Sequence, residues 1–150
     1  MNDVNPLPLT TSVVFRLGTL GSVVTARFTT ALAELGLKPK HVGLMVALDS
    51  GALPSQLELA RIMAVAPSLV VSLADHLELI GAVDRVRDPA DRRRQVLALT
   101  EAGRELLADC TALAHRLDEE LTASLTDPER ETLRRTLGLL GAEAGLPTSD

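Results

Sequence analysis

The stretch 82–100, AVDRVRDPADRRRQVLALT, carries the clearest local pattern in this chain of 150 residues. Apolar and polar residues are mixed over 82–87, and 95–99 is a short, mainly apolar run that begins with Gln95; we interpret both as half-buried strands. The segment 88–94 between them is polar and begins with Asp-Pro, a dipeptide that favours a turn. Two such short runs on either side of a turn predict a β-hairpin.

Two helical patterns precede this hairpin, with a short connection between them. Apolar residues recur at helical spacing over 54–63 and over 67–80, and Gly81 follows the second run. Proline near each start and glycine past the end are typical helix boundaries. Helix, short turn, helix and hairpin in this order predict a helix-turn-helix whose wing is the hairpin. The expected buried side chains of the second helix are Val70, Leu73, Leu77 and Ile80.

Longer helical patterns lie on both sides of this region. One covers 10–35, a shorter one covers 39–48, and two more cover 101–125 and 127–144. A helix of about 25 residues is about 40 Å long, more than a domain of this size usually needs. These helices are apolar on more than one side, so we expect them to pack against a second copy of the chain in a two-fold homodimer. The expected fold class is mainly α with a small β-hairpin wing: a winged helix-turn-helix with an α-helical dimerisation region and six helices.

The composition argues against several classes of protein. Apolar residues make up 46% of the chain and charged residues 23%, which is unlike a disordered or fibrous protein. Apolar runs stay shorter than about 18 residues, and residues 1–8 contain no Lys or Arg, so we expect neither a membrane span nor a secretory signal. The single cysteine, Cys110, fits a reducing, cytoplasmic location. With Phe15 and Phe28 as its only Phe, Tyr or Trp residues, the chain is poorly equipped to stack on single-stranded nucleic acid.

The net charge of −5 is unevenly distributed along the chain. Residues 1–100 carry ten Lys or Arg and nine Asp or Glu, a net of +1, whereas residues 101–150 carry five and eleven, a net of −6. Five arginines and three aspartates lie within 84–95. A basic spot of this kind is compatible with a local DNA contact and also with an ordinary solvated loop.

On these residues the chain resembles the MarR family of winged-helix transcription regulators. The strongest motif is DPADRR at 88–93 followed by LALTEAG at 97–103, and the supporting matches are LKP at 37–39, Leu59-Ala60, and DHLE at 75–78. The resemblance implies a single MarR-type domain over 1–150. Its winged helix-turn-helix DNA-binding region is expected at 37–100, and its helical dimerisation region at 9–36 and 101–146.

The resemblance also implies how such a protein works. A homodimer places the helix 67–80 in the major groove of double-stranded DNA and the wing in the minor groove. A small-molecule effector (often an aromatic acid), a metal ion or an oxidant then changes the spacing of the two reading regions.

The wing supplies the strongest candidates for DNA contact. Arg92, Arg93 and Arg94 can reach into a narrow minor groove, where negative potential is concentrated. The alternative is a solvated turn whose ion pairs contribute little. By the resemblance, Arg93 is expected to pair with Asp88 in a structural role, which leaves Arg92 and Arg94 for DNA.

The helix 67–80 offers neutral groups rather than cations on its outward side. Two serines can donate to phosphates or base edges and a valine can touch a thymine methyl, so we expect weak direct readout. His76 is expected to be an ordinary surface residue more often than a DNA contact. Lys38, Lys40 and Arg61 are placed to meet phosphates from the flanks or simply to aid solubility. The candidate DNA-binding residues are Ser68, Val71, Ser72, His76, Arg92, Arg93, Arg94, Lys40 and Arg61.

Other kinds of site have weaker support. Arg16 and Arg27 lie near the apolar side of the first helix and are candidates for holding an effector carboxylate, with an ion pair to the partner subunit as the alternative. Cys110 lies among leucines and is expected to be inert. The three histidines are scattered, and no catalytic constellation or phosphate-binding glycine loop is evident. We therefore expect no metal, no cofactor and no enzymatic activity.

The sequence thus predicts a DNA-binding transcriptional regulator, a ligand-responsive repressor that binds a pseudo-palindromic duplex site as a homodimer. The alternative is a helical dimer of the same fold that acts mainly through protein contacts and binds DNA weakly. The neutral outward side of the helix 67–80 and the net negative charge favour that alternative, and the arginines of the wing oppose it.

Overall fold

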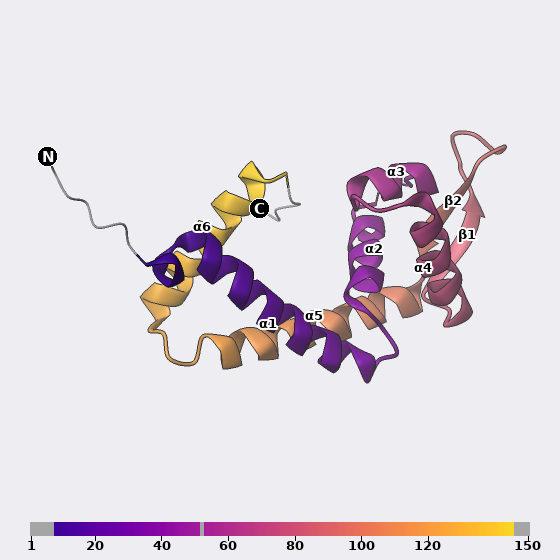
Figure 1. Cartoon of the computed structure of the whole chain (residues 1–150). Helices are drawn as coiled ribbons and strands as arrows, with labels where there is room; N and C mark the ends of the chain where they lie inside the picture. The colour runs from indigo at the N-terminus through magenta and orange to yellow at the C-terminus, as the bar shows by residue number, and fades with distance from the viewer. Residues whose placement is uncertain (1–7, 52, 146–150) are drawn as a thin grey trace, which may run out of the picture. The chain divides into compact units, whose positions relative to one another are not determined.

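A computed structural model describes residues 8–51 and 53–145, and their architecture is helical with one antiparallel hairpin (Figure 1). The elements are the 3-10 turn η1 (Leu9–Thr11), α1 (Val13–Ala33), α2 (Pro39–Asp49), α3 (Gln56–Ile62), α4 (Pro67–Leu79), β1 (Val83–Arg87), β2 (Gln95–Leu99), α5 (Glu101–Leu121) and α6 (Asp127–Glu143). The expected fold class, with six α-helices and a hairpin wing, is confirmed. The chain divides into two units, 1–114 and 115–150, which are described separately.

The helices begin where local capping chemistry allows. In α3, the Ser55 hydroxyl accepts from the Glu58 N–H at 3.3 Å, and the Glu58 carboxylate accepts from the Ser55 N–H at 2.7 Å, which is a capping box. In α1, the Ser12 hydroxyl accepts from the Phe15 N–H at 3.2 Å. The helix therefore starts at Val13, and the expectation of a start at Thr10 is wrong because residues 9–11 form a 3-10 turn instead.

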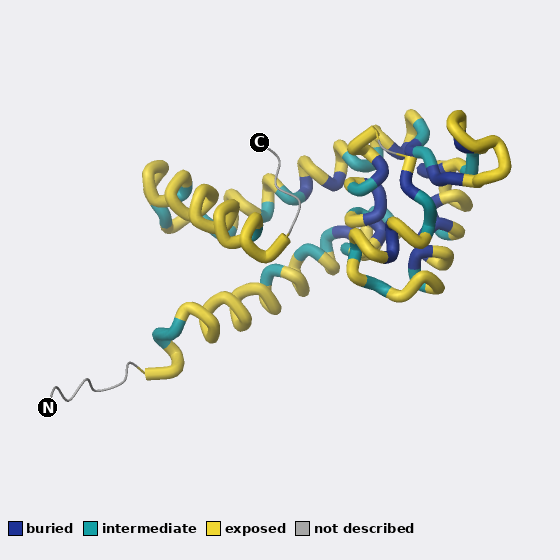
Figure 2. Tube along the Cα trace, turned by 90° about the horizontal axis from the view of Figure 1, so that it is seen from above, coloured by how far each residue is buried: buried dark blue, intermediate teal, exposed yellow. Residues whose placement is uncertain are grey.

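The core of the first unit lies in the winged helix-turn-helix, and Figure 2 shows its buried segments gathered there. Fully buried side chains come from every element of that region and from α1 and α5; they include Leu32, Leu44, Met45, Leu59, Val70, Leu77, Val83, Leu97 and Cys110. In α4, burial of Leu73 and Leu77 is confirmed, but Ile80 is 43% exposed. Ile80 is the C-cap, so the buried face ends one turn earlier, and Ala74 completes it.

The turn between α3 and α4 has the geometry of a helix-turn-helix. The two helices are bent by 109° from one another. Ala64 adopts a left-handed φ of 51°, and the Val65 N–H then donates to the Ala60 carbonyl at 3.0 Å. Within the described residues, no single helix is long and apolar enough to cross a membrane; only α3 and α4 taken together reach that composition.

The hairpin is joined to α5 by a dense contact at its base. Its strands pair in the register Val83↔Leu99 to Arg87↔Gln95. The Thr100 hydroxyl donates to the Gly81 carbonyl at 2.7 Å and accepts from the Gly103 N–H at 2.9 Å, which confirms Thr100 as the cap of α5. The Thr100 N–H donates to the Ala82 carbonyl at 3.1 Å, so α5 starts directly against the turn that enters the wing.

In each unit a long helix leaves apolar side chains in solvent. Most of α1 is exposed in Figure 2. Its exposed apolar residues include Val13, Val14, Leu17 and Leu20. In α6, which begins with a capping box between Thr126 and Glu129, every residue from 131 to 140 is exposed, leucines included. These helices have apolar surface that the single chain does not cover.

Gly103 provides the first testable prediction. A Cβ on Gly103 would lie 2.0 Å from the Ala82 carbonyl oxygen and 2.9 Å from Leu99 Cδ1. Relieving this clash would require the backbone at Ala82 to move, which is energetically costly. Gly103→Ala should therefore lower the free energy of unfolding by about 3 kcal/mol in urea denaturation at fixed protein concentration. Gly138→Ala, where the new Cβ meets nothing within 4 Å, should raise it by up to about 1 kcal/mol through helix propensity. Gly103→Ala as stable as the parent would show that α5 does not approach the hairpin this closely.

Candidate nucleic-acid interface

The outward face of α4 is exposed and uncharged at its N-terminal half. Ser68, Val71 and Ser72 are exposed, with Val71 at 40%, and they lie one turn or less apart on the helix. Ala66, at the N-cap, provides no side-chain hydrogen bond to the first turn. This face can offer hydroxyl groups and a methyl surface to a DNA groove, but no cation.

His76 is half-buried, and its ring contacts two other segments of the protein. Its Nε2 lies 3.0 Å from the Gly36 carbonyl oxygen, and because a carbonyl only accepts, Nε2 carries the proton in this contact. Its ring stacks on His41 with centroids 4.5 Å apart and an interplanar angle of 27°. The expectation that His76 is an ordinary surface residue is wrong: it ties α4 to the turn between α1 and α2.

The C-terminal half of α4 is acidic, and an arginine of β1 offsets part of its charge. Arg85 forms ion pairs with both Asp75 and Glu78, with one guanidinium nitrogen on each carboxylate. Sequence reasoning missed this contact, because nothing in the spacing of the three residues shows that β1 runs beside α4. The single positive charge of Arg85 balances one of the two negative charges, which lowers the repulsion between DNA and the helix that is expected to approach it.

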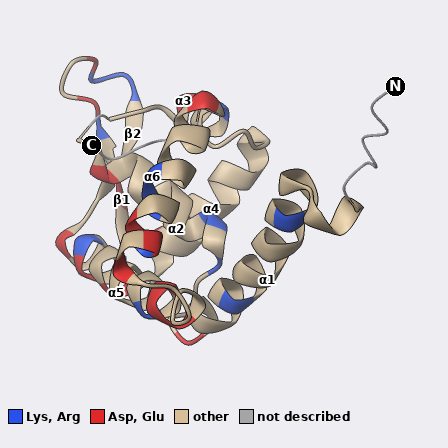
Figure 3. Ribbon diagram, turned by 90° about the vertical axis from the view of Figure 1, so that its left-hand side faces the viewer, with Lys and Arg blue, Asp and Glu red and all other residues tan. Residues whose placement is uncertain are grey.

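The wing presents a cationic surface that is larger at its base than predicted. Arg92 and Arg93 are exposed, and together with Arg87 and Gln95 they line an open hollow of about 410 Å³. Figure 3 shows Lys or Arg positions, in blue, along the hairpin. Arg87 donates from Nη1 to the Arg92 carbonyl at 3.4 Å. Arg87 was not among the predicted DNA contacts, although the alternation of the strand 82–87 already placed it on an exposed position next to the loop.

The ion pair predicted within the wing involves a different arginine. Arg94, not Arg93, faces Asp88, with Nε 3.9 Å from Oδ2, and the expectation of an Arg93–Asp88 pair is wrong. The hairpin register explains this, because Asp88 follows the Arg87–Gln95 pair and its N–H donates to the Arg94 carbonyl at 3.0 Å. Arg93 instead lies at the tip, where its N–H donates to the Asp91 carboxylate at 3.0 Å.

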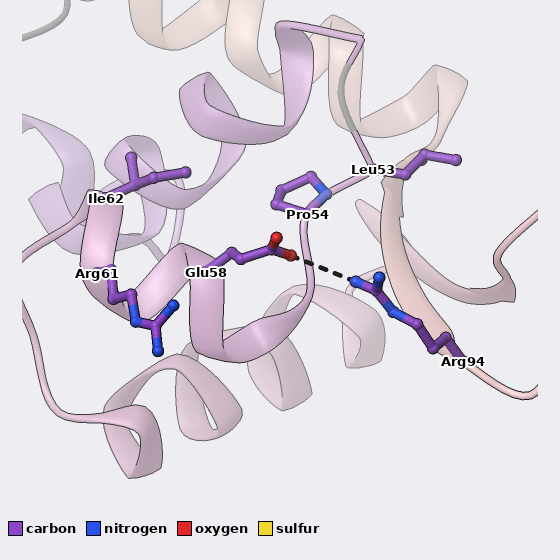
Figure 4. Close-up of a pocket in the computed structure, with 6 residues that line it drawn as sticks. All are labelled: Leu53, Pro54, Glu58, Arg61, Ile62 and Arg94. Carbon is purple, nitrogen blue, oxygen red and sulfur yellow. Dashed lines mark hydrogen bonds and ion pairs between the residues drawn. The ribbon is translucent and has the colours of Figure 1, made fainter. Parts of the chain in front are cut away.

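The flanking cations lie at the surface. Lys38 and Lys40, at the start of α2, are both exposed. Arg61 is exposed on α3 and lines an open pocket of about 490 Å³ with Glu58 and Arg94 (Figure 4). The structure thus brings Arg61 close to the base of the wing.

The residues considered for ligands or metals are separated. Arg16 and Arg27 are both exposed on α1, eleven residues and therefore about 16 Å apart along the axis, and Arg16 Nε donates to the Thr10 carbonyl at 3.1 Å. Burial and the neighbouring Asp109 raise the pKa of the Cys110 thiol, which disfavours the reactive thiolate. Within the residues that the structure describes, no group of three or more His, Cys, Asp or Glu is placed to hold a metal ion.

Known proteins resemble this chain over most of its length. Residues 38–94 match the model of the MarR family. A Thauera aromatica protein to which transcriptional regulation of the hcr operon is attributed is 35% identical over 105 residues, which span 70% of this chain and 61% of that protein. The HTH-type transcriptional repressor Rv2887 of Mycobacterium tuberculosis is 33% identical over 125 residues, or 83% of this chain and 89% of the repressor.

Solved structures agree with the sequence matches. The M. tuberculosis MarR-family protein Rv2887 in complex with DNA superimposes with a TM-score of 0.76 at 29% identity, covering 87% of this chain and 98% of that one. CouR of Rhodococcus jostii RHA1 bound to p-coumaroyl-CoA gives 0.73 at 29% identity, covering 96% and 99%. CouR bound to a 23-mer DNA duplex gives 0.74 at 29% identity, covering 89% and 94%. The winged helix-turn-helix of this chain is therefore that of a transcriptional regulator. The chain belongs to the MarR family.

His41, at the joint between α2 and α4, is expected to make stability depend on pH. Burial, and then the neighbouring His76 and Lys38, lower the pKa of His41 from its ordinary value of 6.5. His41 Nδ1 also accepts from the Lys38 N–H at 2.9 Å, a bond that protonation would abolish. Because the unfolded chain binds this proton more readily, the contribution of His41 is present above about pH 6.5 and is lost as the pH falls below it.

The free energy of unfolding should therefore fall on acidification, by up to about 1.4 kcal/mol per pH unit from this group. His41→Asn keeps an acceptor for the Lys38 N–H but cannot titrate, so it should flatten the decrease measured in urea between about pH 7 and pH 5. His115→Asn, which replaces an exposed histidine of α5, should keep the parental slope. Identical slopes in all three proteins would contradict the prediction.

Proposed function

We propose that this MarR-family regulator is a ligand-responsive repressor that binds a pseudo-palindromic DNA duplex as a homodimer. The observation that carries the proposal is the pairing of two surfaces on one winged helix-turn-helix: the exposed neutral face of α4 and the exposed arginines of the wing. The DNA complexes of Rv2887 and CouR support it, because both proteins share this fold at 29% identity. They also make the alternative of a dimer that acts mainly through protein contacts the less favoured one.

We assign sequence preference to α4 and affinity to the wing. Ser68 and Ser72 are expected to hydrogen-bond to phosphates or base edges, and Val71 is expected to contact a thymine methyl in the major groove. Arg92 and Arg93, with Arg87 behind them, are expected to follow the minor groove, whose negative potential favours guanidinium groups. Lys40 and Arg61 are assigned to flanking phosphates.

We assign DNA binding and dimerisation to the separate regions that the sequence predicts. Residues 37–100 bind DNA, while 9–36 and 101–146 form the dimer. The exposed apolar side chains of α1 and of α6 support this assignment, because a contiguous apolar surface of that kind is usually covered by a partner. A duplex target and a single buried thiol both fit a protein of the cytoplasm.

The effector is the least defined part of the proposal. CouR was solved with p-coumaroyl-CoA, and by analogy we propose that an organic effector alters the spacing of the two DNA-binding regions. Arg16 and Arg27 are about 16 Å apart along α1, so they cannot hold one small carboxylate together. Each would need a partner from another helix or from the second subunit. The proposed activity requires no catalysis.

The proposal is tested by selecting genomic DNA fragments bound by the purified protein and titrating the recovered site at several salt concentrations. We expect preference for the recovered site over a scrambled duplex by about 10³-fold or more, and a linear decrease of log affinity with log salt. Equal affinity for both duplexes with little salt dependence would favour the protein-contact alternative.

The wing and α4 should respond differently to substitution. Arg92→Ala should weaken binding to the selected and the scrambled duplex alike and make the salt slope shallower by about 1.8, since each neutralised phosphate contributes about 0.9 and a dimer has two wings. Ser72→Ala should mainly change which sequences are preferred. Arg134→Ala, which removes an exposed arginine from α6, is the matched control for the loss of one positive charge. Once sedimentation shows that it is as dimeric as the parent, it should bind as the parent does. If Arg92→Ala has the DNA affinity and the salt slope of the parent, the wing is a solvated hairpin and its assignment to DNA binding is wrong.

The dimer can be tested without disturbing the core. Leu20 is 48% exposed in the single chain, so Leu20→Asp removes no core contact but would bury a charge in a dimer interface. We expect this variant to sediment as a monomer at micromolar concentration. Val46→Asp, on α2 and also 48% exposed, lies outside the proposed dimer region and should remain dimeric. A Leu20→Asp dimer as stable as the parental one would contradict the role of α1.

A further inference from the structure

One ion pair spans the space between α3 and the wing. Arg94 Nη2 lies 3.3 Å from Glu58 Oε2, across the open pocket that Leu53, Pro54 and Ile62 also line (Figure 4). On its other side, Arg94 Nε lies 3.9 Å from Asp88 Oδ2. Arg94 is thus placed between a carboxylate of α3 and a carboxylate of its own hairpin.

Each of the two carboxylates that face Arg94 also accepts a hydrogen bond from a backbone N–H, which holds it in place. The oxygen of Glu58 that meets Arg94 also accepts from the Ser55 N–H at 2.7 Å in the capping box of α3. Asp88 is buried at the start of the wing loop, and its Oδ1 accepts from the Ala90 N–H at 2.8 Å. Arg94 therefore joins two pre-positioned acceptors, one on each side of the pocket.

This pair is the polar connection between α3 and the hairpin. Within the described residues, no other hydrogen bond or ion pair joins 56–62 to 83–99. The Arg94 and Glu58 side chains are 46% and 51% exposed, so the pair is expected to add little to global stability. What it does constrain is the direction in which the wing leaves the helix-turn-helix.

We propose that Arg94 is a positioning residue: by bridging Glu58 and Asp88 it holds the wing at a fixed angle to α3, so that Arg92 and Arg93 reach DNA while Arg94 does not. The inference rests on the proposed DNA-binding function. It reassigns Arg94, which the sequence alone placed among the DNA contacts, and it gives Glu58, an acidic residue beside the DNA-binding surface, a favourable role in binding.

The two possible roles of Arg94, phosphate contact and positioning of the wing, predict opposite changes in DNA affinity for Glu58→Gln. Glu58→Gln keeps an oxygen that accepts from the Ser55 N–H and removes a negative charge. If Arg94 met a phosphate, the loss of a competing carboxylate would strengthen DNA binding. If Arg94 positions the wing, Glu58→Gln should weaken binding by about fivefold, because two wings per dimer lose their connection. Glu129→Gln makes the same change in the capping box of α6, where Arg94 has no part. Once sedimentation shows that this control is as dimeric as the parent, its affinity should equal that of the parent.

A second variant tests the same point from the other partner. Lysine is a good phosphate ligand, but its single nitrogen cannot bridge two carboxylates as a guanidinium does. If Arg94 positions the wing, Arg94→Lys should therefore also lose about fivefold in DNA affinity. If Arg94 contacts a phosphate, Arg94→Lys should bind DNA as the parent does. The double variant should be no weaker than either single one. Thermal unfolding of each variant should match that of the parent.

The outcomes separate this inference from the function on which it rests. Parental protein that shows no site preference would overturn the proposed function. Suppose instead that the parent binds its site and that Arg92→Ala weakens this binding. Unchanged or tighter binding by Glu58→Gln, or parental affinity of Arg94→Lys, would then overturn the positioning role alone. Weakening by both variants at unchanged melting temperature supports it.

Discussion

The contact between Thr100 and the backbone of Gly81 and Ala82 is the constraint on which the DNA-binding region depends. Thr100 caps α5 by accepting from the Gly103 N–H, and it donates to the Gly81 and Ala82 carbonyls between α4 and β1. Gly103 makes the approach feasible, because its missing side chain is the space that the Ala82 carbonyl occupies. Since α5 begins against the base of the wing, a shift of its first turn would be transmitted directly to the hairpin. If the proposed effector shifts the start of α5, this contact is the physical route by which the shift would reach the hairpin.

Many of the polar and charged side chains around α4 contact other groups of the protein itself. Arg85 pairs with Asp75 and Glu78, His76 contacts the turn after α1, and Arg94 connects the wing to α3. These contacts hold α4 and the wing in place, and they leave the neutral start of α4 and the exposed arginines of the wing for DNA. A reading region of this kind relies on groove shape and backbone contacts for affinity more than on charged contacts to bases.

The sequence predicted the elements well because their signals are local: Pro39 and Pro67 begin helices, Gly81 ends one, and alternation around Asp-Pro marks the hairpin. It predicted the exposed residues of the candidate interface but not all of the contacts among them. The pairing of Arg94 with Asp88 follows from the hairpin register, which a loop sequence does not reveal. The His76 and Glu58 contacts join segments 40 and 36 residues apart, and such distances are set by packing rather than by spacing.

The most direct test of the account is hydroxyl-radical footprinting of the protein on its selected duplex, because this cleavage reports access to the minor groove. The account predicts two protected minor-groove positions placed symmetrically about the centre of the site. It also predicts that an Arg92→Ala, Arg93→Ala double variant, at saturating concentration, loses these two positions and keeps the remaining protection. A footprint that is the same for the parent and the double variant would contradict the assignment of the wing to the minor groove.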